Sequence, residues 1–288
     1  MQTSLYFPSR LSVYLFLKPD NYMRLKTIIF HLAAATTLAS CGGPDVPRTE
    51  VVAHRGYWAV GGSAQNSIAS LAKADSIGVW GSECDVYLCA DDVLMVNHDH
   101  QTFLGNDTLI MEDTPSSLLQ QVVLANGEPM PLFSAYLDAL KQCRRTKLII
   151  ELKSHALPEE RQKMLAARAV EMVKDEGLRQ RVEYIAFSRT VAEEVIRVDP
   201  AAKVAYLSGD LSPAELKELG YTGLDYHISV MRENEAWFGQ ARELGLEVNV
   251  WTVNDEEGML YLIGQGANFI TTDEPAMLQR ILETSATR

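Results

Sequence analysis

Short runs of apolar and β-branched residues alternate along the chain with longer stretches whose apolar positions recur at helical spacing. Most of the longer stretches begin with Asn, Ser or Asp and end at Gly, as capped helices do. Strands that alternate with helices in this way predict a parallel sheet with crossover helices. The eight predicted strands are 50–54, 80–88, 147–153, 182–187, 203–208, 223–228, 246–253 and 267–273.

The number of predicted strands and the chain length together indicate one α/β domain. The stretch that follows residue 40 has close to the roughly 250 residues of a (β/α)8 barrel. We therefore predict a TIM barrel over 49–288, preceded by a short anchor or linker at 41–48. The interval between the second and third strands is longer than the others, and it contains a further strand-like run that ends at His98. We expect a small excursion there, which could act as a lid or a substrate wall at one mouth of the barrel.

The N-terminal part of the chain reads as a targeting segment, residues 1–40. Arg24 and Lys26 precede an apolar run at 28–38, which is typical of a secretory signal. The run ends in the letters LASC followed by two glycines, and this resembles the lipobox of bacterial lipoproteins, with Cys41 as the lipid-bearing residue. We expect an exported, membrane-anchored protein. The alternatives are an ordinary cleaved signal and a short transmembrane anchor, although the run is shorter than the roughly 20 residues of a span.

The net charge of the chain argues against a nucleic-acid partner and bears on how an anionic substrate could bind. The formal net charge is −12 and the isoelectric point is near 5.0, which argues against nucleic acid as a partner. A negatively charged substrate must therefore be bound by local groups. Cys84, Cys89 and Cys143 are odd in number and have no metal-site spacing, so we expect them to be packing thiols.

Two carboxylates one residue apart stand out in the predicted strand "GSECDVYL". Glu83 and Asp85 point to the same side of a strand, about 6.6 Å apart, and at an effective dielectric near 20 they repel by roughly 2.5 kcal/mol. Glu151 in the adjacent strand raises the repulsion to the order of 7 kcal/mol, a large fraction of a fold's stability of about 5–15 kcal/mol. A divalent cation, Mg²⁺ or Ca²⁺, would offset it with all-oxygen ligands. The alternative is that Arg55 and Lys153 neutralise the acids as ion pairs.

Other polar residues also fall at the ends of predicted strands, which is where the chemistry of (β/α)8 barrels takes place. His54 and His98 each follow an apolar run, and as a pair near a metal they fit a general acid and a general base. Arg55 and Lys153 could hold an anionic oxygen. Four further residues fall at strand ends: Ser188, His227, Trp251 and Asp273.

The remaining histidines of the barrel region are weaker candidates. His100 and His155 look like solvated loop residues, and the role of His227 stays open. His54 and His98, taken alone, are each more often structural than catalytic as well.

Five blocks of sequence, in order, resemble the signature of the glycerophosphodiester phosphodiesterases. The blocks are AHRG at 53–56, SECD at 82–85, HD at 98–99, IELK at 150–153 and TTDEP at 271–275. The resemblance implies a TIM barrel with a divalent metal held by Glu83, Asp85 and Glu151. It implies acid and base roles for His54 and His98. It further implies phosphate contacts from Arg55 and Lys153, and an aromatic near the substrate at Trp251.

The chain departs from the family pattern at two places. Gln65 stands where the family usually has a glutamate, in the letters AQNS, and CADD at 89–92 replaces the usual turn. Neither change removes a predicted ligand, but Gln65 leaves the metal preference and the substrate range open.

The expected activity is hydrolysis of glycerophosphodiesters to an alcohol and glycerol 3-phosphate. One alternative is an enzyme of the same fold that acts on lysophospholipids or phosphoinositides; the polar excursion favours water-soluble head groups instead. Another alternative is a lipid-anchored receptor that binds phosphorylated ligands without turnover. A receptor has little use for an acid–base pair, so the sequence favours an enzyme.

Overall fold

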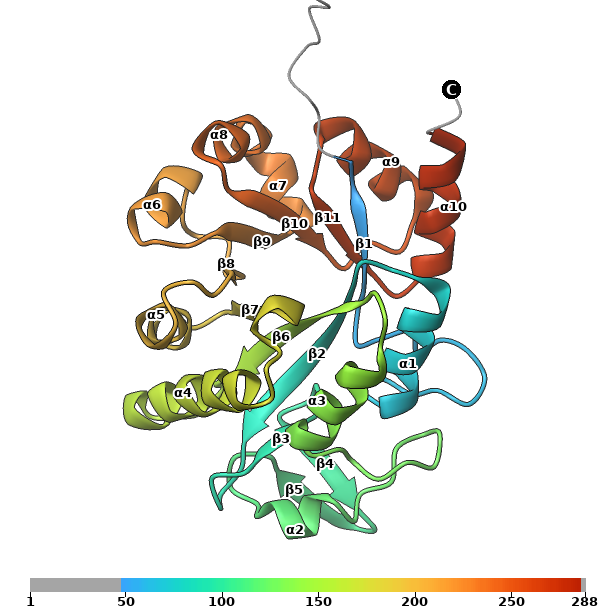
Figure 1. Cartoon of the computed structure of the whole chain (residues 1–288), viewed down its shortest axis with the longest axis vertical. Coiled ribbons are helices and arrows are strands. Elements are labelled where there is room, and N and C mark those ends of the chain that lie inside the picture. The colour runs from blue at the N-terminus through green and yellow to red at the C-terminus, as the bar shows by residue number, and fades with distance from the viewer. Residues whose placement is uncertain (1–47, 286–288) are drawn as a thin grey trace, which may run out of the picture. The chain divides into compact units, whose positions relative to one another are not determined.

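Eight parallel strands close into a barrel in the computed structural model, which describes residues 48–285 (Figure 1). The barrel strands are β1 (Glu50–Ala53), β2 (Gly81–Leu88), β6 (Lys147–Lys153), β7 (Val182–Ala186), β8 (Val204–Tyr206), β9 (Gly223–His227), β10 (Glu247–Trp251) and β11 (Phe269–Thr272). Each strand pairs in parallel with the next, and β1 pairs with both β2 and β11, which closes the barrel. The predicted TIM barrel is confirmed, with all eight strands where the pattern placed them.

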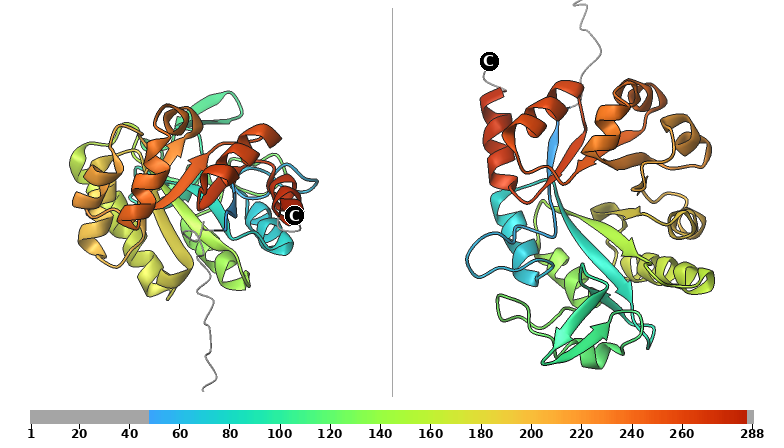
Figure 2. Two further views of the ribbon diagram at one scale, coloured as in Figure 1. Left: turned by 90° about the horizontal axis from the view of Figure 1, so that it is seen from above. Right: turned by 180° about the vertical axis from the view of Figure 1, so that it is seen from behind.

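Helices surround the barrel on its outside (Figure 2). They are α1 (Ile68–Ile77), α3 (Phe133–Gln142), α4 (Glu159–Asp175), α5 (Arg189–Val198), α6 (Pro213–Glu218), α7 (Ile228–Glu233), α8 (Ala236–Leu244), α9 (Glu256–Gln265) and α10 (Pro275–Ser285). Local sequence sets several of their ends. Ser67 and Asp255 cap α1 and α9 with side-chain oxygens, and Ser212 forms a capping box with Glu215 at α6.

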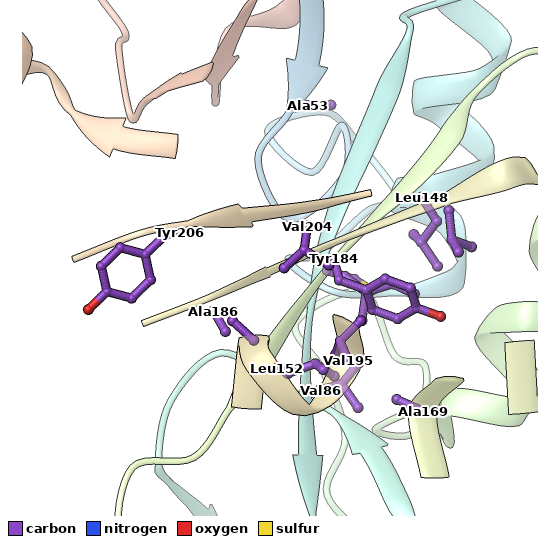
Figure 3. Close-up of a cluster of buried hydrophobic side chains, with 14 of the residues drawn as sticks. Ala53, Val86, Leu148, Leu152, Ala169, Tyr184, Ala186, Val195, Val204 and Tyr206 are labelled. Carbon is purple, nitrogen blue, oxygen red and sulfur yellow. The ribbon is translucent and has the colours of Figure 1, made fainter. Parts of the chain in front are cut away.

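The main core lies between the outer face of the strands and the helices. Figure 3 shows part of it, where Leu148 of β6, Tyr184 of β7 and Val204 of β8 lie near Ala169 of α4 and Val195 of α5. These strand positions are even-numbered, and the odd-numbered neighbours point into the barrel because side chains alternate across a strand. The three thiols at 84, 89 and 143 are free and buried, as expected.

Four charged residues close the inside of the barrel at the N-terminal end of the strands. We call Lys147, Glu183, Lys203 and Glu247 the floor charges. Lys147 Nζ lies 2.9 Å from Glu183 Oε1, and Lys203 Nζ lies 3.6 Å from the same oxygen and 2.7 Å from Glu247 Oε1. The charges therefore alternate in sign around the floor.

The predicted excursion is present between β2 and β6. It holds β3 (Leu94–Val96), the hairpin of β4 (Gln101–Leu104) and β5 (Asp107–Ile110), and α2 (Ser116–Leu119). The run that ends at His98 is β3, which pairs antiparallel with β2 and so extends the sheet outside the barrel. A small apolar cluster of its own, including Met95 and Met111, fixes the excursion against β2.

The predicted signal segment and Cys41 lie outside the described residues. Within residues 48–285, no helix is both long enough and apolar enough to cross a membrane.

Candidate active site

The three predicted acids meet at the C-terminal mouth of the barrel. Glu83 and Asp85 lie on β2, and Glu151 lies on β6 directly opposite Asp85 in the strand register. One carboxylate oxygen from each lies within 4.8 Å of the other two. Glu83 and Asp85 are 3% and 1% exposed, so their mutual repulsion is screened very little by water.

The pKa values of the three acids in this cluster are shifted from their usual ranges. Burial, followed by the charges of Asp85 and Glu151, raises the pKa of Glu83 well above its usual range. Burial and the charge of Asp85 also raise the pKa of Glu151 to about 7. The pKa of Asp85 is lowered, because Lys153, His98 and a hydrogen bond from Asn66 together outweigh its burial.

Cationic side chains compensate the cluster only in part. Lys153 Nζ lies 2.8 Å from Glu151 Oε1 and 3.1 Å from Asp85 Oδ1, and Arg55 Nε lies 3.9 Å from Asp85 Oδ2. The ion pairs considered as the alternative to a metal are thus present. Glu83, however, forms no ion pair among the described residues and accepts only the backbone N–H of Arg55, at 2.7 Å.

The donor set fits a divalent cation. Within the described part of the chain, Glu83 Oε1 and Asp85 Oδ1 are buried without a hydrogen bond, although the ammonium of Lys153 is near the latter. Buried carboxylate oxygens without a donor are costly unless an ion occupies the space between them. All ligands are oxygens, which suits a hard divalent metal.

Asn66 is a residue of the site that sequence reasoning missed. Its Nδ2 donates to Asp85 Oδ2 at 2.8 Å, and its Oδ1 accepts from the backbone N–H of Asp85 at 3.2 Å. Its φ is +58°, a left-handed conformation that asparagine tolerates better than most residues. Next to it, Gln65 Oε1 accepts from Arg55 Nη1 at 2.7 Å. Gln65 therefore orients Arg55 as a glutamate would, but without the negative charge.

His54 is held by a carboxylate. Its Nδ1 lies 2.9 Å from Asp273 Oδ1, and the same carboxylate accepts from Trp58 Nε1 at 3.0 Å and from Asn254 Nδ2 at 2.7 Å. These partners outweigh burial and lower the pKa of Asp273 to about 2. An ionised Asp273 requires His54 Nδ1 to be the donor, which leaves Nε2 for the substrate. The TTDEP block could have indicated this role for Asp273, whereas no motif signals Trp58 or Asn254.

His98 has a similar arrangement at the end of β3. Its Nδ1 lies 2.7 Å from Asp99 Oδ1, and its carbonyl oxygen accepts from the hydroxyl of Tyr87 at 3.2 Å. Burial lowers the pKa of His98, although the charge of Asp85 opposes that change. Both predicted histidines thus pair Nδ1 with a carboxylate.

One cavity of about 270 Å³ joins these groups. We call it the inner cavity. The eighth predicted site residue of the barrel, Asp85, is buried and does not line it. The other seven do: His54, Arg55, Glu83, His98, Glu151, Lys153 and Trp251. The rest of its lining combines the apolar side chains of Ile185, Leu207 and Phe187 with Asp225, Thr252 and Thr271. Trp251 is fixed there, because its Nε1 donates to the carbonyl of Asp225 at 2.9 Å.

Two imidazoles, an acidic cluster and two cationic side chains around one cavity at the mouth of a (β/α)8 barrel are typical of a hydrolytic enzyme. Comparison with protein families agrees with this class. The model of the glycerophosphoryl diester phosphodiesterase family matches residues 54–277, and the chain belongs to this family of phosphoric diester hydrolases.

Individual relatives give the same result. A crystal structure of a glycerophosphodiester phosphodiesterase from Parabacteroides distasonis is 45% identical, with a TM-score of 0.80, over 83% of this chain and 99% of that one. The glycerophosphodiester phosphodiesterase of Caldanaerobacter subterraneus subsp. tengcongensis is 24% identical over 80% of this chain and 96% of that protein. A phosphodiesterase from Oleispira antarctica, solved with the product sn-glycerol-3-phosphate, shares the fold at a TM-score of 0.67 and 24% identity, over 81% of this chain and 96% of that one.

Proposed function

We propose that the protein hydrolyses glycerophosphodiesters, the deacylated head-group diesters of phospholipids, to an alcohol and glycerol 3-phosphate. The observation that carries the proposal is the inner cavity, where acids, histidines and cations face one space large enough for a phosphodiester. The Oleispira antarctica relative, solved with glycerol 3-phosphate as its product, supports the same substrate class.

Glu83, Asp85 and Glu151 would hold a divalent metal, Mg²⁺ or Ca²⁺. When bound, such an ion neutralises charge on the phosphoryl oxygens and makes the phosphorus more electrophilic. Arg55 and Lys153 then bind the non-bridging oxygens through charge-assisted hydrogen bonds. Lys153 becomes available for this role once another cation compensates Asp85 and Glu151, its partners in the structure.

His54 and His98 act as the acid–base pair. One accepts the proton of the attacking hydroxyl, and the other protonates the oxygen of the leaving alcohol. The attacking hydroxyl belongs either to water or to the 2-position of the glycerol, in which case a cyclic phosphate forms and water opens it. Asp273 and Asp99 hold the rings and stabilise the imidazolium form, which the base reaches when it takes the proton and from which the acid gives its proton.

The test is metal-dependent release of glycerol 3-phosphate from glycerophosphocholine. His54→Ala and Glu83→Gln should each lose nearly all turnover, because they remove an acid–base group and a ligand. The matched control is Glu183→Gln, in the floor. Wild-type turnover in His54→Ala would contradict the assignment.

Two further outcomes would identify the rival functions. Tight binding of glycerophosphocholine without product under single-turnover conditions would indicate a receptor. Faster turnover of intact lysophospholipids than of free diesters would indicate the sister enzyme on the same fold.

We also propose that the enzyme is exported and anchored to a membrane through a lipid on Cys41. The support is the sequence pattern at 24–41, which lies outside the described residues. Labelled palmitate should enter the wild type and not Cys41→Ala, and the variant should leave the membrane fraction. Export of an unlabelled, soluble wild type would indicate an ordinary cleaved signal instead.

A further inference from the structure

A second hollow, of about 570 Å³, opens beside the inner cavity. We call it the outer lobe. It shares His98, Glu151, Lys153 and Phe187 with the inner cavity, so the two spaces meet at the predicted acid–base and metal groups. A phosphodiester carries two substituents on its phosphorus, and two spaces that meet at the reacting centre can receive one substituent each. Seven residues line the outer lobe and not the inner cavity: Tyr87, Asp99, His100, Leu152, Ser154, His155 and Ser188.

His100 forms part of this wall. It lies in a loop, as expected, but its side chain is only 29% exposed and therefore only partly solvated. Its Nδ1 is buried and lies 3.3 Å from Oε2 of Glu112. Glu112 is 6% exposed, and it accepts from the backbone N–H of Ala156 at 3.2 Å. The ring of His155 lies 4.5 Å from that of His100, at an angle of 38°. The excursion thus places the buried carboxylate of Glu112 directly behind the side chain of His100, which lines the lobe.

The charges around the outer lobe are predominantly negative. Asp99 lines it while its Oδ1 lies 2.7 Å from His98 Nδ1, Glu151 lines it at the border with the inner cavity, and Glu112 lies behind His100. Among its described lining residues, the sole lysine or arginine is Lys153, which is already in contact with Asp85 and Glu151 and is assigned to the phosphate. An alcohol that carries a carboxylate or a further phosphate would find no cation left to receive it.

The uncharged surface of the lobe is aromatic. Phe187 is 45% exposed at the border of the two spaces, and the imidazoles of His100 and His155 provide further flat faces. Aromatic faces beside carboxylates are a favourable environment for a weakly hydrated cation.

We propose that the outer lobe binds the alcohol half of the diester and selects alcohols that carry an ammonium group, such as choline and ethanolamine. The proposal rests on the proposed function, since it concerns the substrate of that reaction. Glu112 supplies the attraction, because Asp99 is engaged with His98, and Phe187 with the imidazoles of His100 and His155 covers the methyl or methylene groups.

Two matched substrates test the selection. Glycerophosphocholine is compared with its 3,3-dimethylbutyl analogue, in which a carbon replaces the nitrogen, so that shape is kept and charge is lost. The wild type should favour the choline ester in kcat/KM by roughly five- to tenfold, which lies between the sizes of an exposed and a desolvated cation–aromatic contact. A ratio near one would overturn the proposal while leaving the proposed function intact. Cleavage of neither ester would overturn both.

Substitutions then locate the selection in the outer lobe. Glu112→Gln should lower the ratio of the two kcat/KM values by roughly threefold or more, because it removes a charge and keeps the shape. Asp113→Asn, at the exposed neighbouring position, is the matched control and should leave the ratio unchanged. The analogue serves as the internal reference in each protein, so a general loss of activity does not alter the ratio. An unchanged ratio in a folded Glu112→Gln variant would overturn the role of the lobe.

Discussion

The two ends of the barrel both carry charged residues, but opposite charges are paired at one end and like charges converge at the other. At the N-terminal end, the floor charges alternate, and each carboxylate of the floor has a lysine within 2.9 Å. At the C-terminal mouth, three carboxylates converge within 4.8 Å of one another, and one of them, Glu83, has no ion pair in the described structure.

The difference separates stability from function. The arrangement of the floor is one that stabilises the fold, because opposite charges are in contact. The rings of Trp80 and Phe269 also pack against each other, with 4.1 Å between their centroids. The mouth costs free energy in the metal-free state, because like charges are buried together. A fold retains such a cost where a bound cation offsets it and catalysis needs the arrangement.

The largest predicted effect comes from removing one charge at the mouth. Glu83→Gln should lower metal-dependent kcat/KM by at least about a thousandfold, since a ligand is lost. The same variant, with metal chelated, should melt at or above the wild-type temperature because a repulsion is relieved. Activity assays and calorimetry with EDTA measure the two quantities. A marked fall in melting temperature would show that Glu83 is structural, like the floor charges.

The next effect concerns the carboxylate that holds His54. Asp273→Asn keeps the shape but removes the charge, and it permits the wrong tautomer of the ring. We expect kcat to fall by roughly a hundredfold or more, with a smaller change in KM. The pH profile of kcat should shift as well, which a purely structural role would not produce. Steady-state kinetics between pH 5 and 9 provides the measurement.

A smaller effect is the dependence of metal-free stability on pH. The pKa of Glu151 rises from 4.5 to about 7 on folding, so this group binds more protons in the folded state between these values. Its contribution to the free energy of unfolding therefore falls as pH rises from about 4.5 to about 7. In EDTA, the melting temperature should decline across this window more steeply in the wild type than in Glu151→Gln. Parallel curves would contradict the raised pKa.

The smallest effect belongs to the floor. Glu183→Gln weakens the contacts with Lys147 and Lys203, both of them partly exposed, so we expect a loss of about 1 kcal/mol in the free energy of unfolding. The kcat should not change, because the floor lies at the far end of the strands from the inner cavity. Denaturant unfolding and the standard assay together test this. A loss of activity at full stability would show that the two ends are coupled.

The sequence by itself determined the barrel and most of the lining of its mouth. Strand side chains alternate with a period of two, and the C-terminal ends of parallel strands meet at one edge. These two rules were sufficient to bring Glu83, Asp85 and Glu151 together, with His54 and Lys153 beside them, from residues far apart in the chain.

Only the tertiary structure decided which partner holds each of these groups. Asp273 reaches His54 because β11 pairs with β1, and Asn66, which itself has a left-handed backbone conformation, reaches Asp85 from the loop before α1. Glu112 lies behind His100 because the excursion folds on its own small core. A hydrogen bond is made or lost over differences of a few tenths of an ångström in the donor–acceptor distance, and the pattern of apolar and polar positions does not specify distances at that scale.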